Sequence, residues 1–167
     1  MPLSPTDKKR VRKHMTDFCS RAETHETVWH YSQQRPFHGF GVAPEHVHVG
    51  DCSAYVSLVF NWAMHQTGVY FADPLGYSYS GFGYTGSELL WLETHGKKIV
   101  NGQFYVGDLA INGHSRWTTV HTFICKKNGT AASSLWSSFG NENAPGQVKL
   151  DYHPVPLLGC WRHPALL

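Results

Sequence analysis

The sequence predicts an α+β fold in which helices from the first half of the chain pack on a small antiparallel sheet from the second half. Apolar residues recur at helical spacing in the first half, and short β-prone runs separated by Asn, Gly and Asp turns fill the second. A chain of 167 residues is long enough for one core and too short for two ordinary ones. We therefore expect residues 1–167 to form a single domain.

Two helices are expected before residue 70. The first begins near Ser4 and has one apolar face, made of Val11, Met15, Phe18, Cys19 and Ala22. The second follows Asp51, a candidate N-cap, and stops at Gly68. Apolar residues cover most sides of this second helix, so we expect it to be buried.

A third helix is expected from Ser87 to His95, because Thr85 and Glu88 have the spacing of a capping box. Residues 29–49 form a long ordered loop, and loops of this length in compact domains usually carry function. The remainder is expected to contain short strands at residues 98–100, 104–106, 109–111, 120–125, 134–136 and 148–150.

The composition excludes several classes of protein. Apolar residues make up 41%, charged residues 16% and the net charge is +2, which argues against disorder and against a strongly basic nucleic-acid binder. No apolar run approaches the ~20 residues of a membrane helix and no secretory signal is visible, so we expect synthesis in the cytoplasm without membrane insertion. The four cysteines form no C-x-x-C pair and should be reduced thiols, and we expect a monomer.

Cys52 is the candidate nucleophile, because it occupies the first turn of the second helix. The helix dipole and the unpaired N–H groups there favour a thiolate and could hold an oxyanion. A buried cysteine is more often a simple core residue, but packing in a core gives no reason for a cysteine to lie at the N-terminus of a helix. His121, at the mouth of the strand at residues 120–125, is the candidate base. Glu142 is the candidate group to orient its ring, with Asn141 and Asn143 as alternatives.

Other features are consistent with a ligand groove or a rival site. The glycine-rich and aromatic segment at residues 76–86 suits a substrate wall. Candidate substrate-binding side chains are Ser53, Tyr79, Phe82, Tyr84 and Trp117. A zinc site at His46, His48 and Cys52 is the main rival, but these residues match neither of the usual zinc patterns, so we expect no metal and no cofactor.

Several motifs resemble those of the NlpC-type cysteine peptidases of cell walls. Residues 50–56 resemble the D-C-S-G-[FY] signature with Ala54 in place of glycine, residues 107–110 resemble its G-D-L segment, and residues 118–124 resemble the strand that bears the catalytic histidine. A more detailed resemblance is to the peptidase domain of lysin A endolysins from phages of mycobacteria and related actinobacteria. It is carried by residues 31–36, 73–76, 79–86 and 139–145.

The resemblance implies a papain-like NlpC-type fold and a Cys52–His121–Glu142 triad, with Tyr31 near the nucleophile. Phe139 and Asn141 depart from the pattern, where a histidine and a serine are usual. The implied activity is that of a phage endolysin, which accumulates in the host cytoplasm and then hydrolyses peptide bonds in the stems or crossbridges of peptidoglycan. The alternatives are an amidase that cuts between muramic acid and L-alanine, and a non-catalytic wall-binding module.

Overall fold

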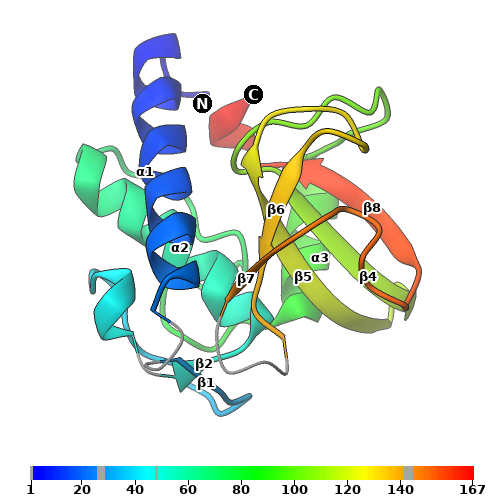
Figure 1. The fold of residues 1–167 in the computed structure, drawn as a ribbon, viewed down its shortest axis with the longest axis horizontal. Helices are drawn as coiled ribbons and strands as arrows, with labels where there is room; N and C mark the ends of the chain where they lie inside the picture. Colours follow the sequence, from blue (N-terminus) through cyan, green and yellow to red (C-terminus); the bar gives the residue numbers. More distant parts are fainter. Residues whose placement is uncertain (1, 26–28, 48, 141–144) are drawn as a thin grey trace.

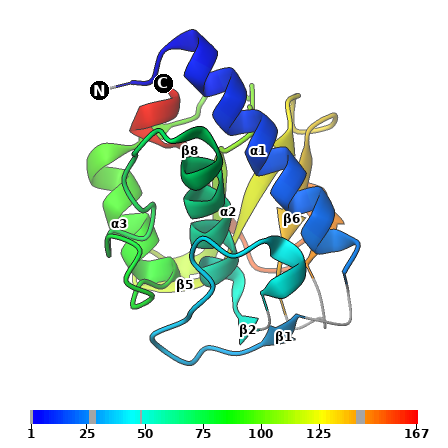
Figure 2. The same cartoon turned by 90° about the vertical axis from the view of Figure 1, so that its left-hand side faces the viewer.

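The computed structural model describes residues 2–25, 29–47, 49–140 and 145–167, and it confirms the α+β fold. In this part of the chain, three α-helices lie against one face of a six-stranded antiparallel sheet (Figures 1 and 2). The strand order is β3-β8-β4-β5-β6-β7. The strands are β3 (Lys97–Lys98), β4 (Leu109–Ser115), β5 (Thr118–Lys127), β6 (Leu135–Ser138), β7 (Gly146–Val148) and β8 (Leu157–Arg162).

The first two helices are those that the sequence predicts. Helix α1 (Pro5–Glu23) begins after Ser4, whose side chain accepts a hydrogen bond from the Asp7 N–H at 3.1 Å, and the predicted apolar face is buried. Helix α2 (Cys52–Thr67) lies between α1 and the sheet and is buried along most of its length. It ends at Gly68, whose φ of 66° is in the left-handed region that glycine adopts readily.

The third helix begins two residues earlier than predicted. Helix α3 (Thr85–His95) has Tyr84 at its N-cap, so Thr85 is its first residue and not its cap. The predicted capping box is wrong because both of its side chains have other partners. Thr85 contacts the sulfur of Cys52, and Glu88 is turned into the core, where it accepts a hydrogen bond from Thr122.

The second half of the chain contains two features that the sequence analysis missed. Strand β8 pairs with both β3 and β4, so it lies inside the sheet although it is last in the sequence. Strands β1 (His30–Tyr31) and β2 (Val49–Gly50) form a short parallel pair that closes the long loop before α2. The strands expected at residues 98–100 and 104–106 are reduced to β3 and to an isolated bridge between Phe104 and Gly129.

The sheet separates two apolar clusters. The helix-side cluster joins α1, α2 and α3 to the sheet and includes Phe18, Tyr55, Phe60 and Ile124. The smaller far-side cluster lies on the opposite face; its members are Phe104, Ala110, Phe123, Cys125, Trp136, Leu150 and Cys160. The segment that follows β7 crosses this far face, as Figure 1 shows in orange.

All four cysteines are free and buried, in agreement with the prediction of reduced thiols. Within the described ranges, none of the helices has the length and apolar character needed to span a membrane.

Candidate active site

Cys52 is the first residue of α2, as predicted, and borders a hollow of about 320 Å³. Only 4% of its surface is exposed. The walls of the hollow come from the long loop before α2, from the start of α3 and from the start of β5; they include Gln33, Arg35, Ser53, Tyr84, Thr85 and Val120. The thiol therefore lies at the base of a concave surface that joins three separate parts of the chain, which is a common setting for a reactive group.

The immediate contacts of the sulfur are polar. Its Sγ lies 3.7 Å from the Thr85 Oγ1, and the backbone N–H of Thr122 also hydrogen-bonds to it. Burial nevertheless raises the pKa of Cys52 to about 12, and the negative charge of Asp51 adds to this effect. Loss of water around the sulfur therefore opposes the thiolate that the start of the helix favours.

Arg35 fixes the wall of the hollow to the start of α2. Its guanidinium donates hydrogen bonds to the Asp51 carboxylate at 2.8 Å, to the Ser53 hydroxyl at 2.9 Å and to the Gly83 carbonyl at 2.8 Å. The same carboxylate caps α2 by accepting from the Ala54 N–H at 2.8 Å. Asp51 thus has two functions, of which the sequence predicted only the cap.

Replacing Asp51 by alanine should lower the free energy of unfolding by about 2–5 kcal/mol, because it removes a helix cap and leaves the half-buried Arg35 charge unpaired. Asp51→Asn should cost clearly less, since a carboxamide oxygen can still accept from the Ala54 N–H. Urea denaturation of both variants measures the difference. Equal losses would show that the cap contributes nothing.

His121 lies on the far face of the sheet. Alternate residues of a strand point to opposite faces, and Thr122 and Ile124 face the helices, since Thr122 bonds Glu88 and Ile124 belongs to the helix-side cluster. The His121 ring instead stacks over Phe123 of the far-side cluster, at 5.9 Å between ring centroids.

Three side chains hold the His121 ring in this position. Its Nε2 is 2.7 Å from the Ser138 Oγ and also hydrogen-bonds to the Tyr152 hydroxyl. The ring of His153 stacks on it at 4.9 Å with an interplanar angle of 11°. Burial lowers the pKa of His121 to about 4, and the neighbouring His153 contributes to this shift, so the imidazole is neutral at pH 7.

In the described part of the chain, Cys52 and His121 are linked only through the backbone of Thr122. Among the described residues no hydrogen bond links the sulfur to the imidazole, although the sulfur contacts the backbone of Thr122, the next residue after His121. The Nδ1 atom of His121 has no hydrogen bond to any described residue. If Nε2 donates its proton to Ser138 or Tyr152, the lone pair on Nδ1 is the basic one.

The predicted third member of the triad, Glu142, and its alternatives Asn141 and Asn143 lie outside the described residues, so this assignment stays a prediction. Ser138 and Tyr152 contact the ring in the structure, and the sequence analysis missed both. The one available signal was the polar and aromatic run at residues 151–153 before a proline, because such residues in a connecting segment often contact a site.

Glu88 is a second buried group that the sequence analysis missed. Its side chain is 0% exposed; Oε1 accepts from the Thr122 hydroxyl at 3.1 Å, and Oε2 has no partner among the described residues. Burial raises the pKa of Glu88 well above 4.5, and the charges of Asp73 and Asp51 add to the shift. Burial therefore favours the protonated form of Glu88, which contacts Thr122, one of the residues next to the sulfur.

We expect Glu88→Gln to become more stable relative to the native protein as pH rises. The folded pKa of Glu88 lies above its ordinary value of 4.5, so the stabilisation from this group is complete below that pH and is lost as pH rises toward the folded pKa. The loss is at most about 1.4 kcal/mol per pH unit. A neutral glutamine avoids it. Urea denaturation between about pH 5 and about pH 8 should show this widening difference, and parallel curves would contradict it.

Some of the predicted substrate-binding residues lie near Cys52 and others do not. Ser53 and Tyr84 border the hollow. Tyr31 is also near Cys52, because burial and the nearby thiol raise the pKa of its hydroxyl. Tyr79 has a structural role instead, because its hydroxyl donates to the backbone carbonyls of residues 71 and 72. Phe82 and Trp117 are exposed and do not border the hollow.

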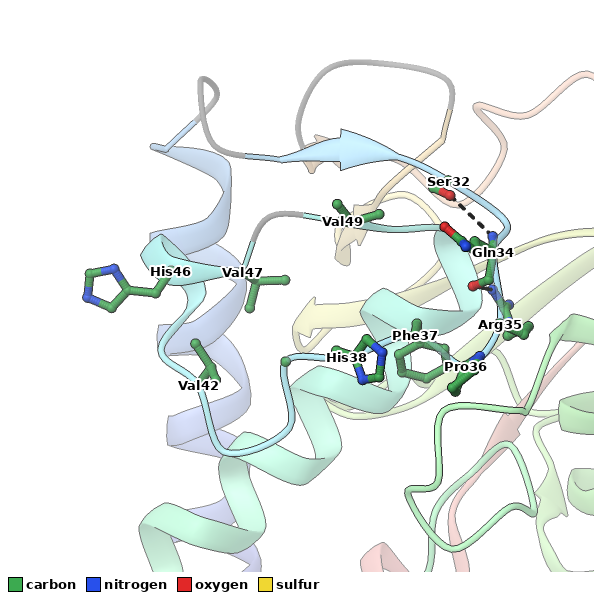
Figure 3. Close-up of a pocket in the computed structure, with 11 residues that line it drawn as sticks. Ser32, Gln34, Arg35, Pro36, Phe37, His38, Val42, His46, Val47 and Val49 are labelled. Atoms are coloured by element: carbon green, nitrogen blue, oxygen red, sulfur yellow. Dashed lines mark hydrogen bonds between the residues drawn. The ribbon is translucent and has the colours of Figure 1, made fainter.

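The zinc alternative is not supported by the residues that the structure describes. His46 lies in a 3₁₀ helix (Pro44–His46), and Figure 3 shows its ring pointing away from the neighbouring side chains. His48 lies outside the described residues. In the described ranges, no three His, Cys, Asp or Glu side chains are grouped so that they could hold a metal ion.

Comparison with solved structures gives the fold a context. The protein NlpC1 from Trichomonas vaginalis matches 91% of this chain with a TM-score of 0.55 and 11% sequence identity. The fold is NlpC-like. This chain spans 43% of that longer protein. No protein-family model matches the sequence, and neither does any curated protein. The NlpC-like fold agrees with the prediction, and at this level of identity it establishes the architecture alone.

Proposed function

We propose that the protein is a cysteine hydrolase that cleaves amide bonds in the peptide part of bacterial peptidoglycan. The observation that carries the proposal is Cys52 itself: a free thiol at the first residue of a buried helix, bordering a polar hollow, in an NlpC-like fold. A core cysteine has no need of the helix N-terminus or of the hollow. The motif resemblance around residues 50–56 supports the same activity.

In the proposed reaction, the Cys52 sulfur attacks the scissile carbonyl carbon as its proton passes to the Nδ1 atom of His121. The N–H groups at the start of α2 receive the oxyanion. The imidazolium then protonates the leaving amine, and His121 removes a proton from the water that hydrolyses the thioester. Glu142 is proposed to orient the imidazole, together with Ser138 and Tyr152.

This mechanism requires the His121 Nδ1 to contact the sulfur, and no hydrogen bond among the described residues joins the two. The neighbouring backbone at Thr122 already contacts the sulfur, so the required movement is local. Catalytic hydrogen bonds are often formed only when substrate is bound. Substrate that covers the hollow would also exclude water and favour transfer of the thiol proton to the imidazole over its release to solvent.

The finer proposal is a phage endolysin that cuts stem or crossbridge peptides during host lysis. It would act as a monomer, be made in the host cytoplasm and reach the wall after the membrane has been permeabilised. The motif resemblance at residues 31–36 and 79–86 supports this role.

Mass spectrometry of digested peptidoglycan tests the proposed function. A peptidase creates new N-termini within the peptides, whereas an amidase releases intact stem peptides from the glycan. A wall-binding module releases neither and still sediments with the wall after thiol alkylation. Absence of any new amino group would overturn the hydrolase proposal.

A further inference from the structure

A second hollow lies within the loop that precedes α2 (Figure 3), and we call it the loop pocket. Its volume is about 490 Å³, and it is lined by residues between Ser32 and Val49. This volume falls within the range of roughly 300–1,000 Å³ that small-molecule sites usually have. It is a separate hollow from the one that Cys52 borders, and the mechanism proposed above does not use it.

One segment separates the loop pocket from the Cys52 hollow. Gln33 borders the Cys52 hollow, Ser32 and Gln34 border the loop pocket, and Arg35 borders both. The side chain of Arg35 is held by Asp51, so the dividing wall is fixed to the start of α2. A ligand that lies across residues 32–35 would therefore occupy both hollows at once.

Among the described residues, the lining of the loop pocket contains no acidic side chain and has two kinds of surface. Val42, Val47 and Val49 supply apolar walls, and Ser32 and Gln34 supply hydroxyl and amide groups. Besides two histidines, His38 and His46, the only basic side chain among the described residues that line it is Arg35, which is already paired with a carboxylate, and there is no Asp, Glu or Lys. Such a lining suits a neutral group that has both apolar and hydrogen-bonding surfaces. It offers no acidic partner to an ammonium and no unpaired arginine or lysine to a carboxylate.

The following step rests on the proposed function. Many side chains of peptidoglycan peptides are methyl groups, which are far too small for this pocket. The longer ones end in ionisable carboxylate or ammonium groups, for which the described lining offers no acidic side chain and no unpaired arginine or lysine. The neutral units of suitable size are the N-acetylated sugars, which combine an acetyl methyl group and C–H faces with hydroxyl and amide groups. We infer that the loop pocket binds the N-acetylated sugar that carries the stem peptide, so the substrate is a glycan-attached peptide.

Binding to the Cys52→Ser variant tests this inference without turnover. Isothermal titration calorimetry would compare a purified disaccharide-peptide fragment of peptidoglycan with the same peptide lacking the sugars. We expect the sugar-bearing fragment to bind at least about tenfold more tightly. Val49→Trp, at a half-exposed position on the pocket wall, should remove this advantage by filling the pocket. Gln34→Ala should reduce it with less risk to folding.

Val100→Trp is the matched control, because Val100 is 89% exposed and does not border the pocket, so the sugar preference should survive there. Equal affinity for the two fragments, or a preference that persists in folded Val49→Trp and in Gln34→Ala, would overturn the inference. Its failure is distinct from failure of the proposed function. If the native protein cleaves the bare peptide without any sugar preference, the hydrolase proposal stands and the sugar-binding inference fails. If binding depends on the sugar but no cleavage occurs, the sugar-binding inference stands and the hydrolase proposal fails.

Discussion

Replacing Cys52 by serine is expected to abolish the release of new amino groups from purified peptidoglycan. Loss of a nucleophile in enzymes of this mechanistic type lowers kcat by roughly 10⁴-fold or more. A serine hydroxyl at this position is a far weaker nucleophile than the thiol, because a hydroxyl gives up its proton much less readily. The rate of amine release, with the fold checked by circular dichroism, is the measurement.

Cys160→Ser provides the control for this experiment. Cys160 has the same exposed fraction, 4%, but lies in the far-side cluster on the other face of the sheet. We expect it to keep the native rate. If Cys52→Ser cleaves at the native rate, the thiol is not the nucleophile and the mechanism is refuted.

Replacing His121 by alanine should lower the rate of cleavage by about 10²–10⁴-fold, the usual contribution of a general base. In the native protein, the rate should also fall as pH falls through about 4, because the imidazole then becomes protonated and cannot accept the thiol proton. The pH profile of kcat/KM measures this for the free enzyme. Native activity in His121→Ala would mean that another group is the base.

Tyr152→Phe separates the base from the group that positions it. The variant keeps the ring that packs edge-on against Phe123 and removes the hydroxyl that bonds the His121 Nε2. We expect a smaller loss, of about tenfold, consistent with one hydrogen bond. A change of equal size in both variants would indicate that Tyr152 itself takes part in proton transfer.

The helices could be predicted because their signals are local. The period of apolar residues in α1, the Asp51 cap and the Gly68 stop each depend on neighbours within a turn or two. The placement of Cys52 followed from those signals. The α+β class followed from the order of helices and strands along the chain.

The rest depends on contacts between distant segments. Strand β8 lies between β3 and β4, and no local pattern reveals that position. The Thr85 and Glu88 pair fits a capping box by spacing, but tertiary contacts with Cys52 and Thr122 take both side chains away. The face that His121 presents is set by the register of β5 against β6, in which Ile124 pairs with Ser137.

The unequal size of the two apolar clusters has a dynamic consequence. The far-side cluster is the smaller one, and the crossing segment contributes Leu150 to it and holds Tyr152 and His153 against the catalytic histidine candidate. Amide hydrogen exchange in this segment should therefore be much faster than in α2, because detaching it exposes little apolar surface. Such a local fluctuation would let the imidazole approach the sulfur, while the helical layer stays intact.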